Sequence, residues 1–267
     1  MRFSFLGTQS SARSSGRLQP YQSLFVSDHA DGTTVINHLG VDMHAHWLPG
    51  VDDGAQDYNE AIQIIQKLSD LGYRKLIATP HIMSGYYENE PMHLIETFEK
   101  FLRKFLLENI DLELSLAAEY MIDEGFKKHL DDDFFLLLPR KMILVELPIL
   151  NSYSGYKELL FELKLKGYQP VIAHPERYGY MHVDMKQYEE LKEAGCLFQL
   201  NMLSLKGYYG KNVTSIAQEI LDRNWYDLVG TDLHNKDQIG QLKNIEVSGH
   251  FLNHTLIKNV ATPIPTI

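Results

Sequence analysis

The stretch Val41-Asp42-Met43-His44-Ala45-His46 decides how the rest of the chain is interpreted. It predicts a short buried strand that ends in two histidines. Side chains two positions apart on a strand point to the same side, so His44 and His46 can reach the same metal ion. A His-X-His pair also occurs by chance, and the remainder of the chain has to decide between these two interpretations.

Six further apolar runs follow along the chain, and segments with helical spacing separate them. The seven expected strands cover residues 41–44, 75–79, 112–118, 142–147, 170–173, 196–200 and 228–231. The expected helices cover residues 59–71, 92–108, 156–166, 185–194 and 213–223. Gly72, Gly167 and Gly195 stand between a helix and the next strand, where glycine commonly caps a helix in the left-handed conformation.

The alternation of strands and helices indicates an α/β fold with a parallel sheet and crossover helices. An open doubly wound sheet and a closed, distorted seven-stranded barrel both agree with it. The length of 267 residues suits a single α/β barrel. We expect one catalytic domain over residues 40–260, a flexible N-terminal lead-in over residues 1–39 and a proline-containing tail over residues 261–267.

The composition limits the classes of partner. Acidic residues outnumber basic ones by 35 to 25, and the net charge of −10 argues against nucleic acid. An anionic substrate stays possible, because bound metal ions can reverse the local field. Cys196 is the single cysteine and begins an apolar run, which predicts a buried structural thiol and fits a reducing compartment. No apolar run approaches the ~20 residues of a membrane span, and residues 1–6 are too short for a signal peptide, so we expect a cytoplasmic protein.

Side chains that can bind metals stand at the ends of six of the seven expected strands. In chain order they are His44, His46, Asp52, Asp53, His81, Glu119, Glu146, His174, Asp232 and His234. In parallel α/β folds the carboxyl ends of the strands converge in space. A lone aspartate or histidine after a strand is more often a helix cap or a loop residue. Six such coincidences in one chain favour a common site.

Glu146 is the most informative of these residues, because it lies inside an apolar strand, where an unpaired carboxylate is unfavourable. Histidine and carboxylate ligands suit manganese, iron, zinc, magnesium or cobalt, and the set exceeds what one tetrahedral zinc requires. Two or three divalent ions therefore fit better. Arg177 follows His174 by three residues and is either a ligand for a phosphate oxygen or a member of an ordinary ion pair.

The motifs that carry these residues resemble those of the polymerase-and-histidinol-phosphatase (PHP) family, and within it the capsule-type bacterial protein-tyrosine phosphatases. The resemblance spans about residues 40–259. It rests mainly on VDMHAHWLPGVDDG at residues 41–54, AHPERY at residues 173–178 and GTDLH at residues 230–234.

The resemblance implies a distorted (β/α)7, TIM-like barrel with the active site at the carboxyl ends of the strands. It also implies a centre of two or three metal ions, with manganese as the first choice. Asp53 matches the family's ligand position, whereas Asp52 is its neighbour. Arg177 matches the arginine that contacts phosphate, and His174 or His234 is a candidate for proton transfer to the leaving group. The implied ligands are His44, His46, Asp53, His81, Glu119, Glu146, His174, Asp232 and His234.

The function implied by the resemblance is hydrolysis of phosphotyrosine in a protein, such as a tyrosine kinase that controls polysaccharide export. A small-molecule phosphatase, for example a histidinol-phosphate phosphatase, is the alternative enzyme. A non-catalytic metal-binding module is the alternative from another class, and the complete ligand set argues against it. Five loop tyrosines are expected either to line a substrate cleft or to pack as ordinary loop residues: Tyr86, Tyr87, Tyr178, Tyr208 and Tyr209.

Overall fold

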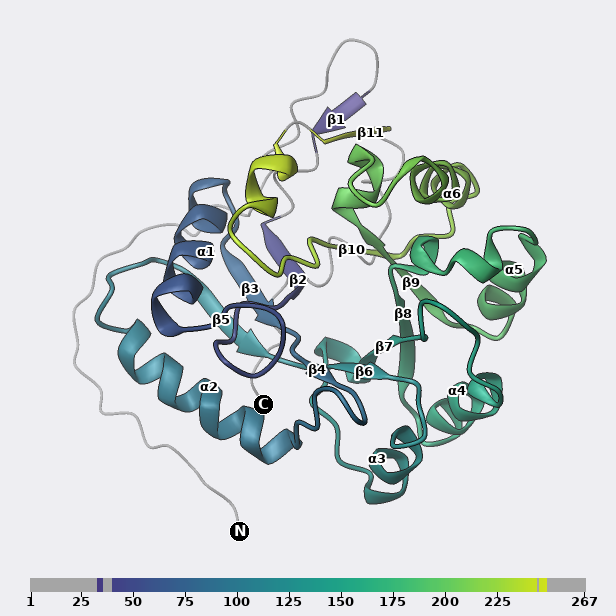
Figure 1. Ribbon diagram of the computed structural model, residues 1–267, viewed down its shortest axis with the longest axis horizontal. Helices are drawn as coiled ribbons and strands as arrows, with labels where there is room; N and C mark the ends of the chain where they lie inside the picture. The colour runs from purple at the N-terminus through teal and green to yellow at the C-terminus, as the bar shows by residue number, and fades with distance from the viewer. Residues whose placement is uncertain (1–32, 36–39, 244, 249–267) are drawn as a thin grey trace, which may run out of the picture.

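The computed structural model describes residues 33–35, 40–243 and 245–248. Most of the expected lead-in, the whole expected tail and residues 249–260 of the expected domain lie outside the described residues. Within the lead-in, β1 (Thr33–Val35) is a strand that pairs antiparallel with β11 (Glu246–Ser248). These two strands form a small sheet at the top of Figure 1.

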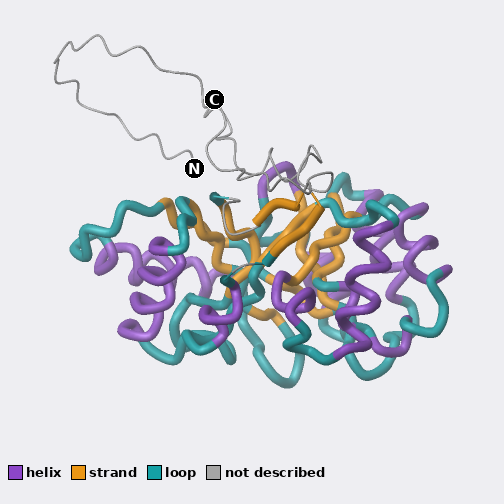
Figure 2. Tube along the Cα trace, turned by 90° about the horizontal axis from the view of Figure 1, so that it is seen from above, coloured by secondary structure: helices purple, strands orange, loops and turns teal. Residues whose placement is uncertain are grey.

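The other strands of the described residues form two sheets in which all neighbours are parallel. One sheet has the order β10-β9-β8-β7-β6-β4, and the other has the order β2-β3-β5. Figure 2 shows the strands in the middle of the molecule with helices on both flanks. The strands are β2 (Val41–Ala45), β3 (Lys75–Ala78), β4 (His81–Ile82), β5 (Glu113–Leu116), β6 (Glu119–Met121), β7 (Met142–Glu146), β8 (Gln169–Ala173), β9 (Leu197–Asn201) and β10 (Leu228–Gly230).

All seven expected strands are present, and two further short strands, β4 and β6, were not predicted. The strand expected over residues 75–79 is β3, and β4 begins after Thr79 and Pro80. Proline has no N–H for a sheet ladder, which is a physical reason for the break between them. The strand expected over residues 112–118 is β5, and β6 begins just beyond it. The parallel α/β fold expected from the sequence is therefore confirmed.

The five expected helices are also present, and a sixth was not predicted. Glycines 72, 167 and 195 have φ angles of 102°, 84° and 76°, which confirms the predicted left-handed helix ends. The unpredicted helix α3 has seven residues and buries only Phe126 and Leu130, so its sequence carries little periodicity. The helices are α1 (Tyr58–Asp70), α2 (Pro91–Phe105), α3 (Phe126–Asp132), α4 (Tyr156–Leu165), α5 (Lys186–Glu193) and α6 (Lys211–Asp222). Among the described residues, no helix is long and apolar enough to span a membrane.

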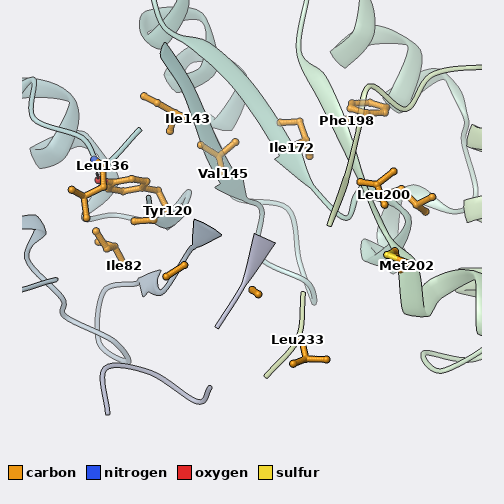
Figure 3. Packing of buried hydrophobic residues seen from close by; sticks show 14 of the residues in the cluster. Ile82, Tyr120, Leu136, Ile143, Val145, Ile172, Phe198, Leu200, Met202 and Leu233 are labelled. Carbon is orange, nitrogen blue, oxygen red and sulfur yellow. Dashed lines mark hydrogen bonds between the residues drawn. The ribbon is translucent and has the colours of Figure 1, made fainter. Parts of the chain in front are cut away.

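Alternate residues of β7 belong to two apolar clusters. Ile143 and Val145 join the larger cluster, which Figure 3 shows from close by, whereas Met142 and Leu144 join a smaller one. Side chains alternate across a strand, so Glu146 points to the same side as Met142 and Leu144. Burial on both faces of β7 explains its continuous apolar run, and Glu146 ends the row that faces the smaller cluster.

Backbone hydrogen bonds join the end of β2, in the three-stranded sheet, to the residues that follow β10, in the six-stranded sheet. The Asp232 N–H donates to the His44 carbonyl at 2.7 Å, and the His46 N–H donates to the Leu233 carbonyl at 2.9 Å. Behind them, the buried Asp42 carboxylate accepts from the Thr231 N–H at 3.0 Å and from the Thr231 hydroxyl at 2.5 Å. These bonds bring the end of β2 against the end of β10.

We expect Asp42→Ala to lower the free energy of unfolding by about 2–4 kcal/mol, because it leaves two buried donors of Thr231 without their acceptor. Chemical denaturation measures this change. Lys127→Ala serves as the control: it removes exposed ion pairs with Asp131 and Glu162, which solvent screens, and should leave stability nearly unchanged. Equal losses in the two variants would contradict the role given to the Asp42–Thr231 contact.

Candidate metal centre

The structure brings all nine predicted ligands together in three overlapping groups. The first is His46, Asp53, His81 and His234, the second is His44, Glu119, His174 and Asp232, and the third is His81, Glu119 and Glu146. Within each group, one side-chain nitrogen or oxygen of every member lies within 4.8 Å of the others. All of the nine except Asp53 and His234 are buried. His81 and Glu119 are the first residues of β4 and β6, and the other seven lie at the carboxyl ends of parallel strands or in the loops that follow. Their role as metal ligands stays a prediction, but the convergence on which it depends is present.

The neighbouring carboxylates Asp52 and Asp53 have different surroundings. The Asp52 carboxylate accepts from His46 Nδ1 at 2.8 Å, from the Gly54 N–H at 2.9 Å and from the His81 N–H at 3.0 Å. Its oxygens are therefore engaged behind the histidines. Asp53 Oδ1 instead lies 3.7 Å from His81 Nε2 and 3.5 Å from His234 Nε2. The geometry favours Asp53 as the member that faces the centre.

Gln199 on β9 is a site residue that the sequence analysis missed. Its Oε1 accepts from His44 Nδ1 at 2.9 Å and from the His174 N–H at 3.2 Å, while its Nε2 donates to the Leu200 carbonyl at 2.7 Å. The signal was available in Gln199-Leu200-Asn201, where two amides alternate at the end of an otherwise apolar strand. Only histidines and carboxylates at the strand ends were considered as candidates, and β9 carries neither.

The hydrogen bonds of His44 and His46 determine which ring nitrogen faces the centre. Each Nδ1 meets an oxygen that can only accept, so each Nδ1 donates its proton outward and each Nε2 is the nitrogen that faces inward. The two Nε2 atoms face each other at 3.2 Å. Glu119 Oε2 lies 3.2 and 3.4 Å from them, and Asp232 Oδ1 lies 3.3 and 3.4 Å from them.

Neither of these two oxygens has a hydrogen-bond partner within the described part of the chain, although both are buried. Two imidazole nitrogens and two carboxylate oxygens thus converge on one small buried volume. Such a set of atoms suits a divalent cation, since N and O donors of this kind are the usual ligands of zinc, manganese and iron. The residues present therefore fit a metal centre.

The electrostatics of the buried carboxylates point the same way. Burial and the neighbouring Glu119 carboxylate raise the pKa of Glu146 well above its usual value. Burial also acts to raise the pKa of Asp232, but His44 and the other nearby histidines hold it well below its usual value. The site thus contains more carboxylate than its own side chains can stabilise in the charged form. Bound cations would stabilise the charged form of Glu146.

Two of the predicted ligands adopt a backbone conformation that is unfavourable for residues with a Cβ. His174 has a φ of 30° and Asp232 has a φ of 51°, both in the left-handed region. Such conformations persist where the surrounding structure imposes them, and they cluster at functional sites. Here His174 directly follows β8 and Asp232 lies two residues after β10, and the sharp change of direction turns each side chain into the centre.

Arg177 reaches the same centre. Its Nη1 donates to Asp232 Oδ2 at 2.7 Å, and its guanidinium carbon lies 4.4 Å from the centre of the Tyr209 ring. Its side chain is 20% exposed, whereas that of Asp232 is 1% exposed. The ion pair therefore joins a half-open position to the buried cluster, unlike the surface ion pair that the sequence left open.

The five loop tyrosines lie in different environments. Tyr178 is fully buried, donates to the Ala173 carbonyl at 2.7 Å and accepts from the Leu147 N–H at 3.0 Å. This excludes the cleft alternative for Tyr178, because its ring packs into the larger apolar cluster. Tyr87 stacks on His81 with ring centres 5.5 Å apart, and Tyr86 and Tyr208 are exposed.

Cys196 is buried, as the sequence predicted. Burial raises the pKa of its thiol to about 11, so the thiolate form that a nucleophile requires is scarce at neutral pH.

Comparison with known proteins identifies relatives of the chain. Residues 40–244 match the family model described as capsular polysaccharide synthesis, CpsB/CapC. The tyrosine-protein phosphatase YwqE of Bacillus subtilis is 33% identical over 196 residues, which are 73% of this chain and 77% of YwqE. The putative tyrosine-protein phosphatase CapC of Staphylococcus aureus is 28% identical over 200 residues, again 73% and 77% of the two chains.

Solved structures extend the comparison. A structure described as that of YwqE from Bacillus subtilis and CpsB from Streptococcus pneumoniae, unique metal-dependent tyrosine phosphatases, matches with a TM-score of 0.69 and 32% identity. The match covers 74% of this chain and 81% of the other. The histidinol phosphate phosphatase of Lactococcus lactis matches with a TM-score of 0.50 and 12% identity, over 83% of this chain and 94% of the other. At that identity, the second match shows a shared fold alone.

We expect Gly54→Ala to disrupt the centre, because an added Cβ would lie 1.9 Å from the His46 carbonyl oxygen. The backbone around His46 has to move, and we expect a loss of about 3 kcal/mol in unfolding free energy together with weaker manganese binding. Denaturation and calorimetry measure the two effects. Gly240→Ala is the matched control, since its added Cβ meets no described atom within 4 Å. Full manganese binding by Gly54→Ala would contradict this account.

Proposed function

The chain belongs to the CpsB/CapC family of capsular polysaccharide synthesis, and from this premise we propose that it is a metal-dependent protein-tyrosine phosphatase. The observation that carries the proposal is the convergence of nine histidine and carboxylate side chains around buried oxygens that lack hydrogen-bond partners among the described residues. A reaction of this type needs no thiol nucleophile, and the buried Cys196 agrees with that.

The nine converging residues are the proposed ligands of two or three divalent ions, with manganese as the first choice. Bound ions would supply positive charge for a phosphate ester and would activate a water molecule to attack it. The residues behind the ligands determine which atoms face inward. Asp52 and Gln199 hold the Nδ1 protons of His46 and His44 outward, so that both Nε2 atoms face into the centre.

Arg177 is the proposed contact for a phosphate oxygen. Its bond to Asp232 uses one N–H donor, and a guanidinium has five, so several donors are left for an ester. Its position beside Asp232 places these donors next to the proposed metal ligands. The chain has a net charge of −10. The fixed positive charge of Arg177 therefore attracts a dianionic phosphate ester to this point of the molecule.

His174 and His234 stay candidates for moving a proton to the leaving tyrosine. The side chain of His234 is 18% exposed and that of His174 is 1% exposed, so an incoming substrate meets His234 first. Both also belong to the proposed ligand set. Their Nε2 atoms lie beside carboxylate oxygens of other proposed ligands, which supports ligation as their role.

The proposed substrate is phosphotyrosine in a protein, and a tyrosine kinase of polysaccharide export is the proposed partner. The support is the family description, which names capsular polysaccharide synthesis, and the relatives named tyrosine-protein phosphatases. Histidinol phosphate is the alternative substrate, and the likeness to the Lactococcus enzyme concerns the fold alone. A purely metal-binding module is disfavoured by the presence of Arg177 beside a complete ligand set.

We also propose that the two parallel sheets form one distorted (β/α)7 barrel. The backbone bonds between β2 and β10 support this closure on one side. On the other side, the Ala117 N–H donates to the Ala78 carbonyl at 2.8 Å, and the Glu119 N–H donates to the Pro80 carbonyl at 3.1 Å. These bonds continue the sheet contacts from the pair β3 and β5 to the pair β4 and β6.

Purified protein supplied with manganese is expected to hydrolyse p-nitrophenyl phosphate and a phosphotyrosine peptide, and a chelator should abolish both activities. Elemental analysis should find two or three ions per chain. Turnover that resists chelation would refute the metal mechanism. Rates on histidinol phosphate belong in the same experiment, since faster turnover of that ester would favour the small-molecule alternative.

Cys196→Ser should retain more than about half of the wild-type activity, because a buried thiol with a raised pKa does not attack the ester. The melting temperature, measured alongside, separates a loss of chemistry from a loss of folding. Complete inactivation of a variant that still folds would revive a thiol mechanism.

A further inference from the structure

Arg177 is held between a carboxylate and an aromatic ring at the edge of the metal centre. The carboxylate is that of Asp232, which accepts from Nη1 at 2.7 Å, and the ring is that of Tyr209, at 4.4 Å from the guanidinium carbon. An arginine side chain is long and loses much rotational freedom when it binds a ligand. Two contacts of different kinds restrain this one before any substrate is present.

Asn201 connects the ring to the same carboxylate. Its side-chain Nδ2 donates to Asp232 Oδ2 at 2.8 Å and to the Tyr209 hydroxyl oxygen at 3.1 Å. Arg177 and Asn201 therefore both bind Oδ2, which leaves Oδ1 of Asp232 to face the cluster. One amide thus links the aromatic ring, the arginine's partner and a proposed metal ligand.

Tyr209 is carried by a tight turn rather than by a long loop. Gly207 and Gly210 flank the pair of tyrosines and have φ angles of 77° and 93°. The Gly210 N–H donates to the Gly207 carbonyl at 3.0 Å, and the Thr214 hydroxyl anchors the neighbouring backbone by donating to the Ser204 carbonyl at 2.8 Å. Residues with a Cβ rarely adopt these φ angles, so the two glycines allow the turn that presents the ring.

We propose that Tyr209 is a positioning residue whose ring holds the Arg177 guanidinium in place for the phosphate ester, with Asn201 fixing the ring relative to Asp232. The inference rests on the proposed phosphatase function. A guanidinium that is already restrained loses less freedom on binding, so it binds phosphate more tightly. Removal of the ring should therefore weaken binding of the ester more than it slows the chemical step.

Tyr209→Leu tests the ring. We expect KM for p-nitrophenyl phosphate to rise about five- to tenfold, with kcat changed by less than about threefold, as fits the loss of one cation–π contact. Calorimetry on the manganese-loaded protein should show inorganic phosphate binding weakened by a similar factor. Tyr209→Phe keeps the ring but loses the bond from Asn201, so its KM should lie between that of the wild type and that of Tyr209→Leu.

Trp225→Leu is the matched control for this variant. It removes the aromatic ring that lies 5.0 Å from the guanidinium of Arg223, a cation–π contact of the same kind on the amino-terminal side of β10. KM and phosphate binding should stay unchanged in this variant. An equal rise of KM in Trp225→Leu would show that the Tyr209 effect is not specific to the site, and it would overturn the inference.

A double-mutant cycle with Arg177→Ala separates positioning from a structural role. Once the arginine is absent, Tyr209→Leu should have little further effect on phosphate binding. Chemical unfolding of the metal-free variants should show the same coupling between Tyr209 and Arg177 without any reliance on activity. Additive effects in the cycle, or an unchanged KM in Tyr209→Leu, would overturn the inference. A wild-type protein that hydrolyses neither ester would instead refute the proposed phosphatase, while the unfolding cycle would still test the contact.

Discussion

Two imidazole nitrogens and two carboxylate oxygens face one another where the ends of β2 and β10 meet. The nitrogens belong to His44 and His46, whose protons point outward, and the oxygens belong to Glu119 and Asp232. A buried group of acceptors is unfavourable unless cations or protons occupy the space between them. The backbone bonds that join β2 to the end of β10 bring His44 and His46 against Asp232, and Glu119 reaches them from β6. The packing of the strands therefore creates this unfavourable group, and the relatives named metal-dependent phosphatases agree with a cation as its partner.

A second layer of polar residues keeps this arrangement in place. Glu176 is an example, because it lies between His174 and Arg177 in the sequence yet points away from the centre. Its buried carboxylate accepts from the Asn201 N–H at 3.0 Å, from the Ser204 hydroxyl at 2.7 Å and from the Tyr226 hydroxyl at 2.9 Å. These bonds attach the turn that carries His174 and Arg177 to the end of β9. Side chains held in this way would need little rearrangement to bind a metal ion or a phosphate group.

The backbone contributes as much as the side chains do. His174 and Asp232 adopt left-handed conformations, which are unfavourable and persist only where the surrounding structure imposes them. A Cβ at Gly54 or Gly230 would meet His46 or His44 at 2.6 Å or less, so both histidines lie directly against glycine backbone. Close packing positions the first pair of histidines, and backbone strain turns the side chains of His174 and Asp232 inward. Both effects occur at the same few strand ends.

The amino-acid sequence by itself determined the order of the strands and helices and the candidate ligands, because apolar periodicity and position at a strand end are local properties. It did not determine that Gln199 and Asn201 support the centre, since that depends on β9 lying between β8 and β10 in the sheet. It left open whether Tyr178 faces the cleft or packs, because the same loop position can do either. Which atoms of Asp232 face the cluster and which bind Arg177 was decided only by the tertiary structure, where register and turn geometry bring distant side chains within bonding distance.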